Sequence, residues 1–262
     1  MSKPPPHRAR KRFGQNFLRD EAVIDGIAAA TAPRPEDHLV EIGPGQGALT
    51  EVLVVSCGKL DVVELDRDLV PGLLAAFSVH PHFALHQADA LTFDFGSLVT
   101  GDEQLRVVGN LPYNISTPLI FKLLENAAIF KDMHFMLQLE VVQRLAAKPG
   151  NKHWGRLGIM TQYHCQVEHL FDVPPEAFNP PPKVQSAIVR LTPYQSSPWP
   201  EVNVVSLRKV VQTSFAQRRK TLRNNLKGVL AAEELEALDI DPGARAETLP
   251  LEQFIHMANA CN

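Results

Sequence analysis

Short apolar runs alternate with stretches in which apolar residues recur at helical spacing over the first half of the chain. The runs predict strands at residues 38–42, 60–64, 83–86, 105–108 and 133–139. An N-cap at Asp20 predicts a first helix to about residue 30, and further helices are expected from about residues 48, 67, 116 and 140. This alternation predicts a mostly parallel, doubly wound α/β sheet with helices on both faces.

The pattern changes after residue 160. Two β-like runs, at 162–171 and 184–191, flank the segment DVPPEAFNPPPK, and consecutive prolines cannot donate ladder hydrogen bonds. We therefore expect two paired strands joined by a stiff loop. The stretch PYQSSPWP at 193–200 lacks periodicity and predicts a linker, after which the pattern is helical to the end. The expected domains are a tail at 1–14, an α/β domain at 15–194 and a small all-helical domain at 195–262.

Composition narrows the class of protein. The chain has 262 residues and a formal net charge of −3, and its three cysteines form no Cys-x-x-Cys pair. This favours a reducing compartment over a disulfide framework, and no metal site is predicted. The proline-rich, basic start does not resemble a signal peptide, and no apolar run is long enough to span a bilayer. We expect a cytoplasmic protein with no membrane association.

Positive charge is concentrated in two segments. One is the N-terminal tail, and the other includes Arg218, Arg219, Lys220 and Arg223, with no acidic residue among them. Such clusters bind nucleic-acid phosphates without reading sequence. A solvated surface is the alternative for both segments. The second cluster is expected to bind RNA, and the role of the tail stays open between the two.

A glycine loop follows the first predicted strand. Gly43, Gly45 and Gly47 precede a helix, where glycines allow close backbone approach and helix N–H groups face a ligand. Glu64 ends the next strand, where a carboxylate can accept ribose hydroxyls, and Asp89 follows a third strand, where it can accept an adenine amine. An adenosine-containing ligand is indicated. The loop alone also fits a dinucleotide or a simple tight turn, and Asp89 also fits a turn residue.

The tetrapeptide at residues 110–113 separates these alternatives. The side-chain oxygen of Asn110 and the carbonyl of Leu111 can hold both hydrogens of an adenine amine, which favours a pyramidal nitrogen with an exposed lone pair. Pro112 fixes the loop and lacks a competing donor, and Tyr113 offers a stacking face. A dehydrogenase would need a proton relay, which is not evident here. The tetrapeptide favours methyl transfer to adenine, in which positioning is the main catalytic task.

Several motifs in order carry a resemblance to a known family. GQNFL at 14–18, EIGPGQGALT at 41–50, VELDRDL at 63–69, QADAL at 87–91, GNLPYNIS at 109–116 and PPEAFNPPPKVQSAIVRL at 174–191 resemble the ribosomal RNA adenine N6,N6-dimethyltransferases. FAQRRKTLRNNL at 215–226 is similar to the bacterial members that modify the small subunit. The resemblance covers nearly the whole chain.

The resemblance implies S-adenosylmethionine as methyl donor and a Rossmann-like methyltransferase domain. It implies dimethylation of two neighbouring adenosines in the hairpin near the 3′ end of 16S rRNA. Its implied cofactor contacts are Asn16, Leu18, Gly43, Gly45, Glu64, Asp89 and Asn110. Tyr113 and Phe178 would form an aromatic pair around the target base, although Phe178 also fits a core residue beneath the proline loop. A monomer is expected.

Two further functions remain open from the sequence. One is a related enzyme that acts on large-subunit rRNA, against which the segment at 215–226 argues. The other is a non-catalytic ribosome-assembly factor, for which an intact glycine loop and an intact tetrapeptide at 110–113 would have no purpose.

Overall fold

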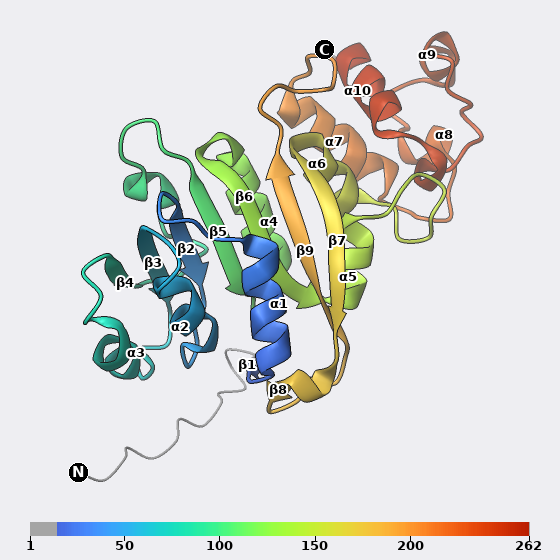
Figure 1. The fold of residues 1–262 in the computed structure, drawn as a ribbon. Coiled ribbons are helices and arrows are strands. Elements are labelled where there is room, and N and C mark those ends of the chain that lie inside the picture. Colours follow the sequence, from blue (N-terminus) through green and yellow to red (C-terminus); the bar gives the residue numbers. More distant parts are fainter. Residues whose placement is uncertain (1–14, 262) are drawn as a thin grey trace. The chain divides into compact units, whose positions relative to one another are not determined.

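The structure, a computed structural model, describes residues 15–261 (Figure 1). The basic tail expected at residues 1–14 lies outside this range. The chain forms two compact units, the first made of residues up to Val142 together with Glu168–Pro193, and the second of Gln143–Val167 together with the chain from Tyr194 onward. The second unit therefore contains residues 143–167 in addition to the helical segment after the linker, whereas the sequence analysis placed 143–167 in the α/β domain.

A seven-stranded sheet is the centre of the first unit, in the order β4-β3-β2-β5-β6-β9-β7. Its strands are β2 (His38–Ile42), β3 (Lys59–Glu64), β4 (Phe83–Gln87), β5 (Leu105–Asn110), β6 (Phe130–Gln138), β7 (Cys165–Val173) and β9 (Ser186–Pro193). Neighbours from β4 to β6 run parallel, and β9 runs antiparallel to β6. The predicted mostly parallel α/β sheet is confirmed.

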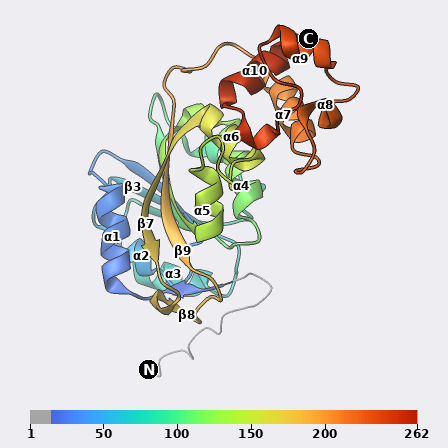
Figure 2. The same cartoon turned by 90° about the vertical axis from the view of Figure 1, so that its right-hand side faces the viewer.

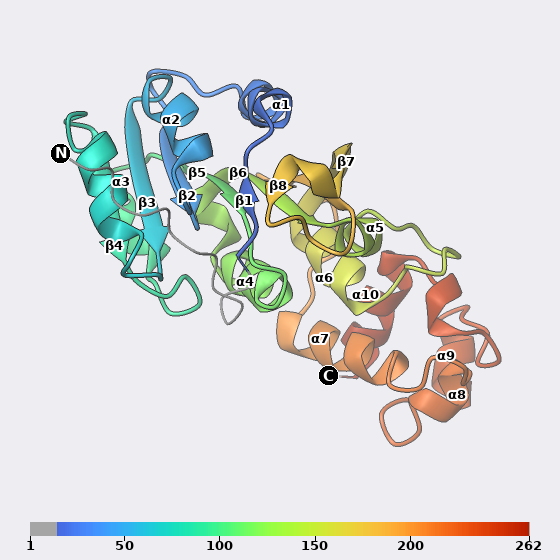
Figure 3. The same cartoon turned by 90° about the horizontal axis from the view of Figure 1, so that it is seen from below.

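Helices cover both faces of this sheet. Those of the first unit are α1 (Glu21–Thr31), α2 (Ala48–Val54), α3 (Val70–Phe77), α4 (Ser116–Glu125) and the start of α5 (Leu139–Leu145). Figures 2 and 3 show α1 and α2 on one face and α4 on the other. Coverage on both faces explains why β2 is buried along its whole length, as expected for a central parallel strand. It also places the loops that follow β2, β3 and β5 at one edge of the sheet.

Local sequence accounts for the start of α1. Asp20 caps α1 as predicted, because its side chain accepts a hydrogen bond from the Val23 N–H at 3.1 Å. A two-stranded sheet not foreseen from the sequence pairs β1 (Phe17–Leu18) with β8 (Phe178–Asn179). β8 lies within the proline-rich segment between β7 and β9, which are neighbours in the large sheet as predicted.

Several boundaries differ from the sequence prediction, and two elements show the largest changes. β6 begins at Phe130 and ends at Gln138, so that Leu139 is the first residue of α5. The strand expected from residue 162 begins at Cys165, because residues up to His164 belong to α6 (Arg156–His164). The Gln162 side chain donates hydrogen bonds of 2.7 and 2.8 Å to the carbonyls of Leu145, the last residue of α5, and of Ala147, which favours the helical position.

The second unit is helical apart from the start of β7. From residue 200 onward its helices are α7 (Val204–Ser214), α8 (Leu222–Asn225), α9 (Ala232–Ala237) and α10 (Leu251–Ala260). Phe215 and Phe254 stack with ring centroids 5.8 Å apart, and the buried Trp154 donates its indole N–H to the Leu249 carbonyl at 2.9 Å. No helix within residues 15–261 is long and apolar enough to cross a membrane.

Candidate active site

The glycine loop between β2 and α2 forms the floor of the site. Gly43 and Gly45 have φ angles of +69° and +60°, which side chains with a Cβ rarely adopt. A Cβ on Gly45 would also lie 3.0 Å from the ring of Phe17. The loop is therefore restricted to glycine at these positions by its own backbone and by the packing of β1.

Glu64 lies at the carboxyl end of β3, beside this loop. One carboxylate oxygen accepts the Gly45 N–H at 3.2 Å, and the other accepts the Asp66 N–H at 2.7 Å. Burial raises the pKa of Glu64, and these two backbone donors counteract the increase. Each oxygen keeps a second lone pair, so the carboxylate can accept two further hydrogen bonds from a ligand.

Asp89 follows β4 and lines the same pocket as Glu64. Its Oδ1 accepts the Leu91 N–H at 2.9 Å, so it does serve as a turn residue. Its Oδ2 makes no hydrogen bond to any other described residue. Asp89 can therefore stabilise the turn and accept a ligand donor at the same time.

The tetrapeptide at 110–113 begins with the last residue of β5 and continues into the loop after it. The Asn110 side-chain nitrogen donates to the Asn16 carbonyl at 3.0 Å, which leaves Oδ1 as the free acceptor. The Leu111 N–H donates to the Met136 carbonyl at 3.2 Å, and no hydrogen bond from residues 15–261 reaches the Leu111 carbonyl. Two acceptors of the kind that the sequence predicted are thus available at the end of β5.

Residues 15–19, which we call the strap, lie across this edge of the sheet. The Gln15 side chain donates to Asp66 at 3.0 Å, and Arg19 donates to Gln46 at 3.0 Å. Together with the bond from Asn110 to Asn16, these contacts attach the strap to the loops after β2, β3 and β5. The strap therefore encloses the space between the glycine loop and the tetrapeptide.

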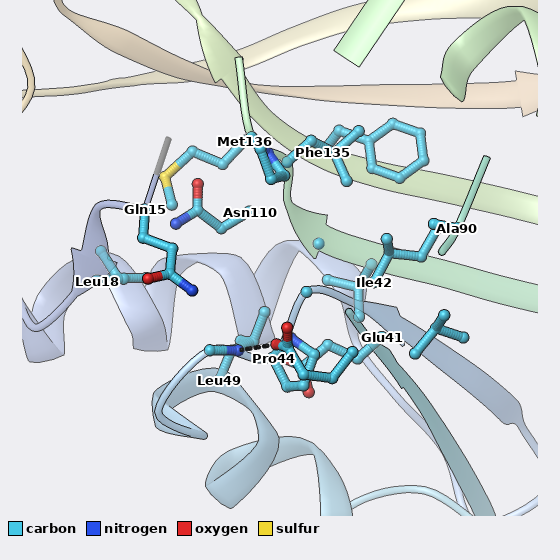
Figure 4. Close-up of a pocket in the computed structure, with 18 of the residues that line it drawn as sticks. Gln15, Leu18, Glu41, Ile42, Pro44, Leu49, Ala90, Asn110, Phe135 and Met136 are labelled. Carbon is cyan, nitrogen blue, oxygen red and sulfur yellow. Dashed lines mark hydrogen bonds between the residues drawn. The ribbon is translucent and has the colours of Figure 1, made fainter. Parts of the chain in front are cut away.

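The enclosed pocket has a volume of about 270 Å³. Figure 4 shows Asn110 and Met136 on one side of it and Pro44 and Leu49 on the opposite side. Its walls include every predicted cofactor-binding residue and all four residues of the tetrapeptide, namely Asn16, Leu18, Gly43, Gly45, Glu64, Asp89, Asn110, Leu111, Pro112 and Tyr113. The fold brings these residues together from five separate chain segments.

Phe178 is placed elsewhere. It is 4% exposed, belongs to the hydrophobic core of the first unit and does not line the pocket. Its backbone pairs with Leu18 of the strap. In this conformation Phe178 is a core residue beneath the proline loop, and stacking on a base would require that loop to shift.

Sequence analysis missed several polar residues of the site. Glu41, inside β2, lines the pocket and accepts a 2.6 Å hydrogen bond from the Thr50 hydroxyl, and burial raises its pKa to about 7. A carboxylate inside an apolar strand was a signal that could have revealed it. Gln15 and Asp66 also line the pocket. Ser186 accepts or donates a hydrogen bond to the Tyr113 phenol, and burial raises the pKa of that phenol.

The second unit carries the predicted basic cluster. Arg218, Arg219, Lys220 and Arg223 are exposed, but the first three lie in a turn after α7 rather than in a helix. Arg218 is paired with Glu247 at 3.5 Å and donates to the Lys152 carbonyl. Within the part of the chain that the structure describes, the other three cations form no ion pair. The same range contains no group of three or more His, Cys, Asp or Glu side chains that could hold a metal ion.

The sheet order, the glycine loop and the paired acceptors after β5 define a methyltransferase of the Rossmann-like class. The sequence profile of the ribosomal RNA adenine dimethylases matches residues 6–262. The chain belongs to this family and is an rRNA adenine dimethyltransferase.

Individual relatives agree with this assignment. The chain is 61% identical to the ribosomal RNA small subunit methyltransferase A of Saccharophagus degradans, over 97% of this chain and 94% of that protein. It is also 61% identical to the Pseudomonas aeruginosa protein of the same name, over 99% and 97% of the two chains.

Solved structures show the same fold. A dimethyladenosine transferase from Plasmodium falciparum superposes with a TM-score of 0.80 at 26% identity, over 92% of this chain and 95% of that chain. The 23S rRNA methyltransferase ErmE superposes with a TM-score of 0.74 at 26% identity, over 94% and 99%.

Proposed function

We propose that this protein transfers methyl groups from S-adenosyl-L-methionine to N6 of two adjacent adenosines in the 3′-terminal hairpin of 16S rRNA. The product would be N6,N6-dimethyladenosine in the small ribosomal subunit. The observation that carries the proposal is the arrangement of Asn110 and Leu111, which leaves two acceptors free beside a pocket built for a nucleoside-like ligand. The 61% identity to small-subunit enzymes over nearly the whole chain supports the choice of RNA.

The pocket fits the proposed methyl donor. S-adenosylmethionine supplies an electrophilic methyl group when bound. Glu64 has two lone pairs left for ribose hydroxyls, and Asp89 has a free oxygen for the adenine amine. Gly43 and Gly45 allow close backbone approach, and Asn16 and Leu18 enclose the pocket from the strap. These residues and Asn110 are our proposed cofactor contacts.

The tetrapeptide would hold the target amine. Asn110 Oδ1 and the Leu111 carbonyl each accept one N6 hydrogen, which orients the nitrogen lone pair away from the loop. Pro112 adds no donor that could occupy the Leu111 carbonyl. No charged base is required, because an alkylated amine loses its proton readily, and catalysis depends on in-line positioning.

A base inside a helix cannot reach an enclosed methyl group, so the adenosine must leave its stack. Tyr113 lines the pocket and is our proposed stacking residue. Phe178 would join it only after a shift of residues 174–185. We propose that RNA phosphates are bound by the basic cluster of the second unit, and that the enzyme is a cytoplasmic monomer acting in small-subunit biogenesis.

The structural likeness to ErmE favours a second candidate, methylation of large-subunit rRNA. One assay separates the two. Purified protein is incubated with radiolabelled S-adenosylmethionine and either under-methylated small subunits or large-subunit RNA, and the RNA is digested. We expect labelled N6,N6-dimethyladenosine from the small subunit alone, and labelling at least about a hundredfold slower with Asn110→Ala. Label in large-subunit RNA alone would establish the second candidate, and label in neither would refute both.

A further inference from the structure

A hydrogen bond of 2.7 Å joins the Tyr113 phenol to the hydroxyl of Ser186, a residue 73 positions away. We propose that Ser186 is a positioning residue, which holds the Tyr113 ring in the orientation that stacks on the target adenine. This inference rests on the proposed function, because it concerns how that site receives its base.

Ser186 is rigidly held. It is the first residue of β9 and lies opposite Gln138, the last residue of β6. Just before it, the Gln185 carbonyl accepts the Leu139 N–H at 2.9 Å. The Ser186 side chain is completely buried and has one rotatable bond before its oxygen. Its hydroxyl is therefore a fixed point in the sheet.

Tyr113 is held at its backbone by a different contact. The Ser116 hydroxyl donates to the Tyr113 carbonyl at 3.1 Å, and Pro112 restricts the preceding backbone. Neither contact determines the two side-chain torsions that aim the ring. The bond to Ser186 acts at the far end of the ring, so it restrains the first torsion, which sets where the ring points. The phenol oxygen lies on the axis of the second torsion, and the preference of a phenol for a hydrogen bond in the plane of its ring favours one tilt about that axis.

The phenol has a physical reason to keep this partner. Tyr113 is half-buried, and a phenol withdrawn from water without a partner is unfavourable. The bond itself occupies neither face of the ring, because it lies at the ring edge. Stacking by a fixed ring would place N6 consistently for both methyl transfers.

A purely structural role for Ser186 is the competing explanation. A buried hydroxyl needs a partner for stability alone, and Tyr113 supplies one. The two roles predict different results. A structural role changes stability, whereas a positioning role changes the turnover number at unchanged affinity for the methyl donor.

The test compares Ser186→Ala, Tyr113→Phe and the double variant, with undermethylated small subunits as substrate. We expect each single variant to lower kcat about tenfold, with KM for S-adenosylmethionine changed less than twofold. The double variant should also be reduced about tenfold rather than a hundredfold, because both changes remove the same bond. Ser186→Thr, which keeps the hydroxyl, should retain most of the kcat of the unaltered protein.

A spectroscopic readout accompanies the kinetics. The chain has three tyrosines, so 3-fluorotyrosine labelling gives three ¹⁹F resonances, and Tyr113→Phe assigns one of them. Ser186→Ala should shift or broaden the Tyr113 resonance and leave those of Tyr163 and Tyr194 in place. Melting temperatures of all variants identify any that are unfolded.

Thr31→Val is the matched control. The Thr31 hydroxyl is buried in the same unit but has no hydrogen-bond partner among the described residues, so removal of this hydroxyl should leave kcat unchanged. Full activity of Ser186→Ala, multiplicative losses in the double variant, or an unchanged Tyr113 resonance would each overturn the inference. Loss of small-subunit methylation by the unaltered protein would instead refute the proposed function.

Discussion

Replacing Asn110 by aspartate would reverse the polarity of one group in the pocket while keeping its shape. In the native chain the Asn110 amide nitrogen donates to the Asn16 carbonyl at 3.0 Å. Aspartate puts an acceptor oxygen in that place, so two acceptors face one another across the strap. Its other oxygen would still be available to an adenine amine. We call the two proposed acceptors, Asn110 Oδ1 and the Leu111 carbonyl, the amine clamp. The change therefore affects the attachment of the strap more than the amine clamp.

The magnitude follows from the bond that is lost. Leaving a partly buried carbonyl without its donor costs about 1–3 kcal/mol. Because the strap encloses the pocket, we expect this cost to appear in donor affinity, as a roughly 5- to 150-fold weaker Kd for S-adenosylmethionine. Asn110→Ala loses the same bond but adds no repulsion, and it removes the clamp. Its main effect should be on the rate, by about 10²- to 10³-fold, as for loss of one preorganised polar group.

Isothermal titration gives the donor affinity, and single-turnover methylation at saturating donor gives the rate. The two variants should separate, with aspartate weaker in binding and alanine slower in transfer. Asn126→Ala, at the C-terminal end of α4 and outside the pocket lining, is the control. Donor affinities equal to that of the unaltered protein in both variants would show that the bond to Asn16 does not hold the strap. Equal rates of the two variants would show that Oδ1 is not part of the clamp.

Three further predictions follow from the structure. In salt titrations of RNA binding, Arg219→Ala and Lys220→Ala should each reduce the slope of log K against log salt concentration by about 0.7–0.9. Arg218→Ala should reduce that slope less, because the Arg218 charge is already paired with an acidic side chain, and equal effects of the three variants would refute this distinction. Burial raises the pKa of Glu41 from 4.5 to about 7, so between these values the group is ionised in the unfolded chain and protonated in the folded one, and the free energy of unfolding falls as pH rises. Glu41→Gln should flatten that fall, measured from urea unfolding curves at several pH values. Gly109→Ala should destabilise the first unit by about 2 kcal/mol or more in the same measurement, because its Cβ would lie 2.6 Å from a carbonyl oxygen of β2.

The fold was largely predictable because its signals are local. β2 was predicted with both ends correct, and the starts of α2 and α4 were also correct. Each of these elements is determined by the apolar spacing of its own residues and by the glycines or polar residues beside them. The predicted strand start at residue 162 was wrong, since β7 begins at Cys165. The Gln162 side chain bonds to carbonyls of another chain segment, and such a contact is not visible in the apolar pattern.

The site was predictable to a similar depth. The glycine loop and the tetrapeptide each follow a predicted strand, and Glu64 is the last residue of another. The carboxyl ends of parallel strands meet at one edge of a sheet, so these features were expected to lie together. Their residues do line one pocket. The roles proposed for them remain predictions, as does that of Phe178, whose burial depends on the pairing of β8 with β1.

The sequence by itself determined the class of fold and indicated which residues we propose to bind adenosine and to accept an amine, since these depend on residue types at short spacing. Only the tertiary structure decided which way the Asn110 amide faces, which cation of the basic cluster is paired and what holds the Tyr113 ring. Asn16 lies 94 positions from Asn110 and Ser186 lies 73 positions from Tyr113. Hydrogen bonds between such distant positions leave no periodic trace in the chain, because they form only when the sheet brings its strand ends together.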